Sequence, residues 1–233
     1  MSEWIDLAVG DGTAMRAYVA SPPGMSSTAA RGLLVFQEAF GVNAHIRDVT
    51  ERFAAQGFLA IAPELFHRTA PGFDCAYTDF PKAMPQLEAI TEQGLDADSR
   101  AAYGWLQKHV GDNIAAVGYC LGGRVSFVAN SGLPLKAAVS YYGGRIPTVL
   151  HRAPTLAAPM MFFWGGLDHH IPEEQHQQVI KGVRDANKTF VDVVFSSADH
   201  GFFCDARASY HPASAAQAWA LTLAFLDSYC RRP

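Results

Sequence analysis

The chain contains the stretch Ile114-Ala115-Ala116-Val117-Gly118-Tyr119-Cys120-Leu121-Gly122-Gly123, in which an apolar run leads into a glycine-rich turn that carries a cysteine. Apolar residues continue at helical spacing to about Asn130, so the stretch predicts a strand, a sharp turn and a helix. In such a turn the central residue has a strained backbone, and the flanking glycines are needed because side chains would collide with the neighbouring strand and helix. Cys120 would then lie at a helix N-terminus, where the helix dipole favours the thiolate. The alternative is a buried structural cysteine in an ordinary glycine-rich turn.

A thiol nucleophile needs a base, and the base needs a third group that orients it. In a site of this kind the acid and then the histidine follow the nucleophile along the chain. Asp168 follows an apolar run that ends at Trp164, and His200 follows the run Phe190–Phe195. Each side chain therefore lies just beyond the C-terminal end of a predicted strand. Asp199 is a rival for the orienting carboxylate, but neighbours in an extended segment point to opposite faces, which favours Asp168.

The loop 37–43 follows the apolar strand Leu33–Phe36. A loop in this position donates one of the two backbone N–H groups that stabilise an oxyanion, and the residue after the nucleophile donates the other. We expect Ala39 and Leu121 to supply these two groups. Glu38 would lie beside the thiol, where a carboxylate could accept a hydrogen bond from it. The alternative for Glu38 is a solvated acid of the loop.

Nine histidines are present, and most histidines are surface or packing residues. His169, His170 and His176 lie close to Asp168 in sequence, but they lack the i, i+4 pairing with a further ligand that is typical of zinc sites. We therefore expect neither a metal nor a cofactor.

Apolar runs and helical patterns alternate along the chain, which is typical of a mostly parallel sheet with helices on both faces. The predicted strands are Ile5–Val9, Met15–Ala20, Leu33–Phe36, Phe58–Ala62, Ile114–Val117, Ala137–Tyr141, Met160–Trp164 and Phe190–Phe195. The predicted helices are His45–Gln56, Asp98–His109, Leu121–Asn130, Glu173–Ala186 and Ala213–Ser228. A surface turn is expected over residues 21–30. The sequence thus predicts a single α/β domain over residues 1–233.

The segment 63–85 shows no clear period and contains several prolines and aromatic residues. Long stretches of this kind in a compact domain are usually functional or partly helical. We expect it to cover the pocket as a semi-rigid lid, and the alternative is a short irregular helix packed for stability.

Several segments in the same order resemble the dienelactone hydrolase family. They are Gln-Glu-Ala-Phe-Gly-Val-Asn at 37–43, Gly-Tyr-Cys-Leu-Gly-Gly at 118–123, Tyr-Tyr-Gly at 141–143, Gly-Gly-Leu-Asp at 165–168 and His-Gly-Phe at 200–202. The resemblance spans nearly the whole chain and implies an α/β-hydrolase fold with a triad of Cys120, Asp168 and His200. It also implies that Glu38 pairs with the resting thiol and that Tyr142 lines the pocket.

The chain departs from that family at the positions that recognise substrate. Members that open dienelactone bind its carboxylate with two arginines, one of which lies four residues after the triad histidine. This chain has Cys204 there, and its next arginine is Arg207. The second arginine belongs between Arg68 and Arg100, where Lys82 is the only cationic residue and is a poor replacement for a guanidinium fork.

Aromatic residues cluster around these positions instead, and we expect a pocket for a neutral, apolar substrate. Those assigned to the pocket are Phe40, Tyr142, Phe202 and Phe203, and further aromatic residues nearby are Phe73, Tyr77 and Phe80.

Composition supports a globular, cytoplasmic protein. Hydrophobic residues make up 49% of the chain, charged residues 17%, and the formal net charge is −4. This balance, without a run of Lys or Arg, argues against nucleic acid or an anionic membrane as a partner. The N-terminus carries acids where a signal peptide has basic residues. We expect a monomer or a homodimer.

Four widely spaced cysteines, with no C-x-x-C pair, fit free thiols. The sequence does not decide whether Cys120 and Cys204 form a disulfide.

These patterns predict a hydrolase that cleaves lactones or activated carboxylic esters through a thioester on Cys120. One alternative is a promiscuous hydrolase of other activated neutral esters, including thioesters and phosphotriesters. A further alternative is a non-catalytic redox sensor that uses Cys120 as its sensing thiol.

Overall fold

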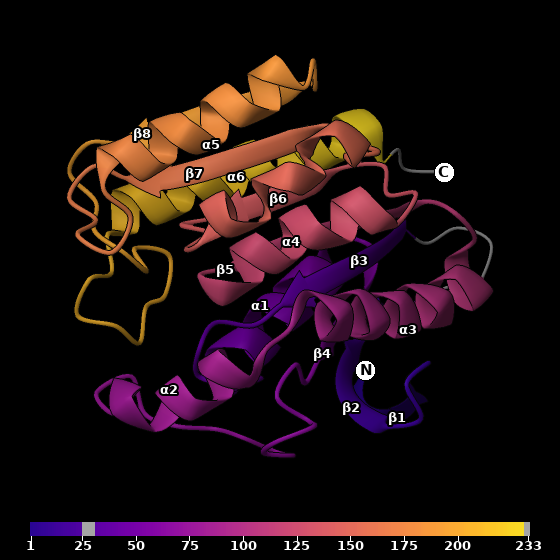
Figure 1. Cartoon of the computed structure of the whole chain (residues 1–233). Helices are drawn as coiled ribbons and strands as arrows, with labels where there is room; N and C mark the ends of the chain where they lie inside the picture. Colours follow the sequence, from indigo (N-terminus) through magenta and orange to yellow (C-terminus); the bar gives the residue numbers. More distant parts are fainter. Residues whose placement is uncertain (25–30, 231–233) are drawn as a thin grey trace.

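An eight-stranded, mostly parallel sheet forms the centre of the molecule, with strand order β1-β2-β4-β3-β5-β6-β7-β8 (Figure 1). The computed structural model describes residues 1–24 and 31–230. Part of the surface turn expected over residues 21–30 therefore lies outside the described residues. The strands are β1 (Ser2–Ala8), β2 (Ala14–Ala20), β3 (Arg31–Phe36), β4 (Phe58–Pro63), β5 (Ile114–Tyr119), β6 (Ala138–Tyr141), β7 (Met160–Gly165) and β8 (Phe190–Phe195).

The two N-terminal strands are antiparallel to their neighbours, and the six strands from β4 to β8 in the sheet run parallel. Strands β3 to β7 are buried along their whole length, which explains their unbroken apolar runs. Edge strand β8 consists of half-buried and exposed residues only, as expected at the rim of the sheet. All eight strands lie where the sequence predicts them, within about three residues.

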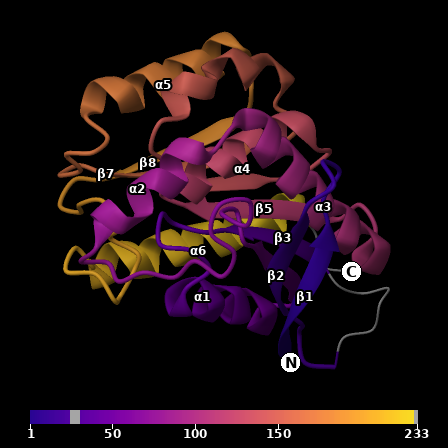
Figure 2. The same cartoon turned by 60° about the horizontal axis from the view of Figure 1, so that its bottom comes forward.

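Helices cover both faces of the sheet, as Figure 2 shows. On one face lie α1 (Ala44–Ala55) and α6 (Pro212–Tyr229), and on the other lie α3 (Glu92–Val110), α4 (Leu121–Gly132) and α5 (Glu173–Asp185). Two further elements complete the fold: α2 (Phe80–Ala89) and a 3₁₀ helix, η1 (Ile146–Thr155). No helix is predicted at η1, where Pro147 and Pro154 interrupt the α-helical pattern.

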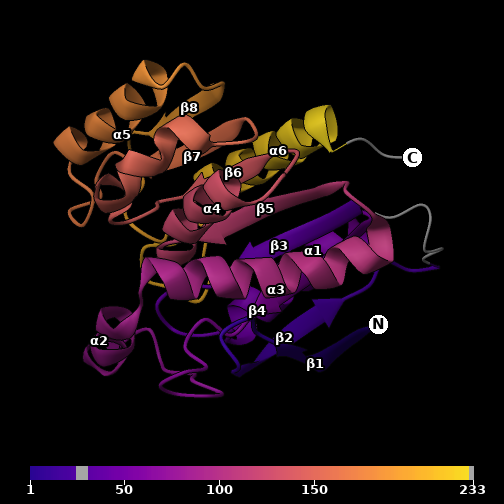
Figure 3. The same cartoon turned by 45° about the vertical axis from the view of Figure 1, so that its right-hand side comes forward.

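The segment 63–85, expected to cover the pocket, contains the first six residues of α2, which lies beyond the end of the sheet toward which β3 and β5 point (Figure 3). Pro81 occupies the first turn of α2, where the missing N–H of proline costs nothing. Helix α3 starts at Glu92, six residues before its predicted start at Asp98. Its true N-cap is Thr91, whose hydroxyl accepts a hydrogen bond from the Gly94 N–H at 3.0 Å.

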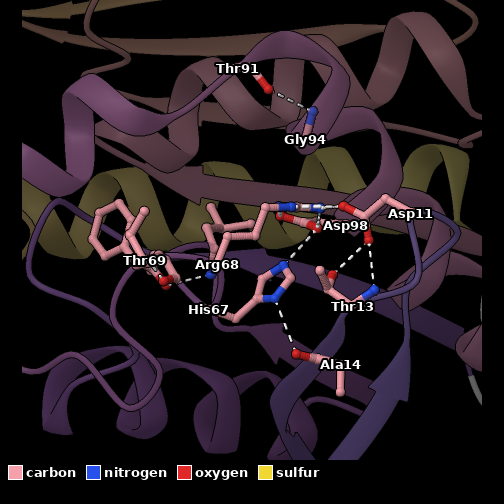
Figure 4. A network of polar contacts seen from close by, with 12 residues as sticks. Asp11, Thr13, Ala14, His67, Arg68, Thr69, Thr91, Gly94 and Asp98 are labelled. Atoms are coloured by element: carbon pink, nitrogen blue, oxygen red, sulfur yellow. Dashed lines mark hydrogen bonds and ion pairs between the residues drawn. The ribbon is translucent and has the colours of Figure 1, made fainter.

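A polar network fixes the chain between β4 and α2 (Figure 4). Asp98 on α3 is 1% exposed and accepts hydrogen bonds from both terminal nitrogens of Arg68, at 2.8 and 2.9 Å. Its Oδ1 lies 3.0 Å from the His67 ring, and the other ring nitrogen of His67 lies 3.1 Å from the Ala14 carbonyl oxygen. Arg68 also binds Asp11 in the β1–β2 turn. The network therefore ties the segment that leads to α2 to both β2 and α3.

Among the described helices, none combines the length and the apolarity that crossing a bilayer requires.

Replacing Asp98 by alanine tests this network. The change leaves the buried His67 without its carboxylate and leaves Arg68 with Asp11 alone, so we expect the free energy of unfolding to fall by about 2–3 kcal/mol. Asp11→Ala is the matched control, because Asp11 lies at the exposed end of the same network and its loss costs about 1 kcal/mol or less. Urea denaturation of both variants measures the difference, and equal losses would contradict the assignment.

Candidate active site

The turn between β5 and α4 has the strained geometry that its glycines predict. Cys120 has φ 55° and ψ −114°, a conformation that residues with a side chain rarely adopt. A Cβ on Gly118 would lie 1.9 Å from the Gly122 carbonyl oxygen, and a Cβ on Gly122 would lie 2.2 Å from the Phe36 carbonyl oxygen. Both positions therefore require glycine, and the thiol is held at the end of β5.

The structure brings His200 and Asp168 together, although 32 positions separate them in sequence. His200 Nδ1 lies 2.7 Å from Asp168 Oδ2, and both residues are buried. The other carboxylate oxygen of Asp168 accepts hydrogen bonds from the N–H groups of His170 and Ile171, at 2.8 and 3.0 Å. The rival Asp199 accepts a hydrogen bond from the backbone N–H of His200 and not from its ring. Asp168 is therefore the carboxylate that orients the imidazole.

His200 is also coupled to Cys120. Burial disfavours the charged imidazole, but the charge of Cys120 and the hydrogen bonds of the ring to Asp168 and Cys120 outweigh it and raise the pKa of His200 to about 10. With this pKa, His200 is protonated at neutral pH, and its imidazolium interacts with the Cys120 sulfur.

The two residues expected to bind an oxyanion through their backbone N–H groups line the same pocket as the thiol. Ala39 follows β3 and Leu121 is the first residue of α4, and both line the pocket with Cys120. Within residues 1–24 and 31–230, neither N–H group donates a hydrogen bond. Both donors are therefore available to a substrate oxygen.

Glu38 lies in the site, but its partner is not the thiol. The side chain is fully buried, and its Oε1 accepts a hydrogen bond from Arg207 Nη1 at 3.1 Å. Among the described residues, the carboxylate forms no hydrogen bond to Cys120, and Oε2 has no partner. The expected contact between Glu38 and the resting thiol is therefore replaced by an ion pair with Arg207.

Arg207 lines the pocket, although the sequence does not predict it as a site residue. The family pattern puts an arginine four residues after His200, whereas here the loop brings in the arginine seven residues after it. Gly201 makes room for it, because a Cβ there would lie 2.4 Å from the Arg207 guanidinium carbon. The guanidinium also lies 5.7 Å from the ring centroids of Phe40 and Tyr77.

Behind Arg207, three buried side chains carry groups that could bind a metal. The ligand atoms of Glu38, His45 and Cys204 lie within 4.8 Å of one another. Burial raises the pKa of the Cys204 thiol to about 11 and lowers the pKa of His45, so the neutral forms of both are favoured at pH 7. The charge of Glu38 is already balanced by Arg207. With Glu38 paired and the Cys204 thiol protonated, the cluster offers a cation no uncompensated negative charge.

The pocket itself has a volume of about 510 Å³. Its lining comprises Ala39, Phe40, Tyr77, Phe80, Leu87, Cys120, Leu121, Arg124, Gly144, Arg145, His170, Gln175, His200 and Arg207. Tyr77, Phe80 and Leu87 belong to the segment around α2, so that segment covers the pocket as expected.

Three of the four aromatic residues assigned to the pocket do not line it. Tyr142 and Phe202 are fully buried and pack against each other, with ring centroids 5.3 Å apart. Phe203 is 3% exposed and packs against Tyr119 on the face of the sheet that α1 and α6 cover. Only Phe40 of the four lines the pocket. The expectation of a neutral pocket is also wrong, because three arginines line it.

The four cysteines are free thiols, so no disulfide joins Cys120 to Cys204. His176 on α5 lies 3.0 Å from Asp192 on the edge strand β8 and does not line this pocket.

Gly122→Ala tests the close contact between α4 and β3. Because the added Cβ meets backbone oxygen that cannot rotate away, we expect a loss of about 2–4 kcal/mol in the free energy of unfolding. Gly104→Ala on α3 is the control, since nothing lies within 4 Å of its Cβ position. That change should stabilise by up to about 1 kcal/mol, because alanine is the better helix former. Calorimetry on both variants shows whether each change lowers or raises the free energy of unfolding.

The raised pKa of His200 predicts a pH dependence of stability. An unfolded histidine loses its proton near pH 6.5, whereas His200 keeps its proton in the folded chain up to about pH 10. The linked stabilisation is therefore fully present below about pH 6.5 and disappears as the pH rises through 10. Urea denaturation from pH 6 to 10.5 should show a steeper loss for the wild type than for His200→Gln. Parallel curves would contradict the raised pKa.

Known proteins match nearly the whole chain. The model of the dienelactone hydrolase family matches residues 15–230. A relative from Synechocystis described as "Putative carboxymethylenebutenolidase" is 36% identical over 203 residues, covering 80% of this chain and 81% of the relative. Carboxymethylenebutenolidase from Pseudomonas putida is 30% identical over 231 residues, covering 97% and 96% of the two chains.

Solved structures agree. A Klebsiella pneumoniae protein described as "Putative Dienelactone Hydrolase" superposes with a TM-score of 0.86 at 31% identity, covering 98% of this chain and all of the other. The dienelactone hydrolase-like phosphotriesterase P91 superposes with a TM-score of 0.85, covering 98% of each chain, but at 22% identity it supports the fold alone. The chain therefore has the α/β-hydrolase fold and belongs to the dienelactone hydrolase family.

Proposed function

We propose that this protein hydrolyses lactones or activated carboxylic esters, with Cys120 as the nucleophile and a thioester as the intermediate. The observation that carries the proposal is the convergence of three groups from distant parts of the chain. The strained turn presents Cys120, His200 interacts with its sulfur, and Asp168 binds the far side of the ring at 2.7 Å. The relatives named carboxymethylenebutenolidase support the same class of reaction.

The acylation step uses groups whose positions are compatible with it. The substrate carbonyl oxygen binds between the N–H groups of Ala39 and Leu121, and the Cys120 thiolate adds to the carbonyl carbon. The resulting oxyanion accepts both hydrogen bonds, and loss of one such donor typically costs about 100-fold or more in rate. Collapse breaks the ester C–O bond, and the leaving alkoxide takes the proton of the His200 imidazolium.

Hydrolysis of the thioester then regenerates the enzyme. Neutral His200 removes a proton from water as the water attacks the thioester carbonyl, and the thiolate leaves with the electron pair of the C–S bond. Asp168 holds the imidazole in the required tautomer and stabilises the imidazolium that forms. The ion pair between Glu38 and Arg207 lies beside this centre and keeps both charges balanced in the resting pocket.

An activated aryl ester tests the nucleophile. With 4-nitrophenyl acetate, the wild type should release a burst of nitrophenolate, and intact-protein mass spectrometry should find one acetyl group on Cys120. Cys120→Ala should lower kcat/KM by about a thousandfold or more. His200→Ala should accumulate the acyl-enzyme if the thiol still reacts, because deacylation lacks its base.

The matched control is Cys230→Ala, which removes another buried thiol near Asn113, at the end of α6. We expect it to keep the burst and the turnover. Full turnover by Cys120→Ala would rule out the proposed nucleophile. Peroxide-sensitive modification of Cys120 without any burst would instead support a redox sensor.

A further inference from the structure

Arg124 is a buried cation that forms no ion pair with a carboxylate of the described residues. It lies in the first turn of α4, four residues after Cys120, and lines the same pocket. The residue is only 9% exposed, and its Nε is buried without a hydrogen-bond partner. Within residues 1–24 and 31–230, its guanidinium forms no ion pair. By contrast, the partly or fully buried guanidinium groups of Arg31, Arg68, Arg152 and Arg207 each bind a carboxylate.

An unpaired guanidinium in this position is costly. Burial, followed by repulsion from Arg145, lowers the pKa of Arg124 from its usual value. Arginine nevertheless stays protonated at any physiological pH, so it cannot relieve the cost by losing its proton. The charges of Cys120 and Glu92 offset this cost only in part. A buried charge in proteins is normally paired, and among the described residues no carboxylate forms an ion pair with Arg124.

Arg145 brings a second positive charge to the same part of the pocket. It precedes η1 in a left-handed conformation, with φ 61°, which is unusual for a residue with a side chain. Its exposed side chain lines the pocket but forms no hydrogen bond or ion pair with the described residues. The strained backbone of Arg145 and its repulsion from Arg124 are both unfavourable. Backbone strain of this kind concentrates at functional sites.

These two arginines differ from Arg207, whose guanidinium already binds Glu38 at 3.1 Å. They come from α4 and from the segment after β6, whereas Arg207 comes from the loop after β8. We propose that Arg124 and Arg145 form a subsite that binds an anionic oxygen group, a carboxylate or a phosphate, carried by the substrate whose ester bond Cys120 attacks. The subsite rests on the proposed function for its place in the reaction, but its ability to bind an anion does not depend on that function.

Paired esters that differ in one charge test the subsite. The anionic esters are 4-acetoxybenzoate and 4-nitrophenyl hydrogen succinate, and each has its methyl ester as the neutral partner. For at least one pair, the ratio of kcat/KM for the anionic ester to that for the neutral ester should fall about tenfold or more in Arg124→Gln. The fall should come mainly from KM, and Arg124→Lys should recover part of it. Arg145→Gln should lower the ratio less, because Arg145 is exposed.

The controls separate this role from simpler ones. Arg100→Gln removes an exposed arginine of α3 outside the pocket and should leave the ratio unchanged. If Arg124→Gln lowers both members of every pair equally, Arg124 only supports the thiolate and the proposal fails. If Arg207→Gln alone removes the preference, the anion binds at Arg207 and the proposal also fails. Adding 4-acetoxyphenyl phosphate shows whether the subsite prefers phosphate to carboxylate.

Binding measured without turnover keeps this proposal separate from the proposed function. Isothermal titration of 4-acetoxybenzoate and 4-acetoxyphenyl phosphate into Cys120→Ala should give a Kd that rises about tenfold or more when Arg124→Gln is added. No difference for either ligand would overturn the subsite even if the protein hydrolyses esters. A clear difference in a protein that cleaves no ester would support the subsite and contradict the hydrolase.

Discussion

The close approach of α4 to β3 is the constraint on which the whole site depends. The Gly122 N–H donates to the Gln37 carbonyl oxygen at 2.9 Å, and the Cys120 N–H donates to the Tyr141 carbonyl oxygen at 3.0 Å. The turn that strains Cys120 is thus bonded to the segments after β3 and at the end of β6. Those same segments carry Ala39 and Arg145, so the backbone of Cys120 and the pocket wall are positioned together.

Charge in the pocket follows a simple pattern. His200 is paired with Asp168, and Arg207 is paired with Glu38, so each of these buried cations has a carboxylate within 3.1 Å. Arg124 breaks the pattern. Electrostatic interactions are strong in such a partly enclosed space, because water screens them less than at the surface. The net charge of the resting pocket is therefore positive on the side formed by α4 and the start of η1.

The sequence predicts the sheet well because fully covered strands must be apolar throughout, and it places Cys120, Asp168 and His200 correctly because each follows a strand end. It predicts the pocket poorly. Phe202 and Phe203 directly follow the His200-Gly201 pair in sequence, yet both rings turn into the packed interior. Arg124 and Arg145 are missed because nothing in their local patterns separates a pocket arginine from a surface arginine. Their roles depend on which elements the fold makes neighbours.

The segment around α2 is anchored at its base by Asp98, whereas α2 itself adds few residues to the core. Of its ten residues only Ala83 is fully buried, and Phe80 and Met84 are 42% and 39% exposed. Mutations on this helix can therefore accumulate without unfolding the sheet, while those at Phe80 and Leu87 reshape the pocket directly. Such an arrangement separates the evolution of specificity from the preservation of the catalytic framework, so related chains can diverge in substrate while keeping the same chemistry.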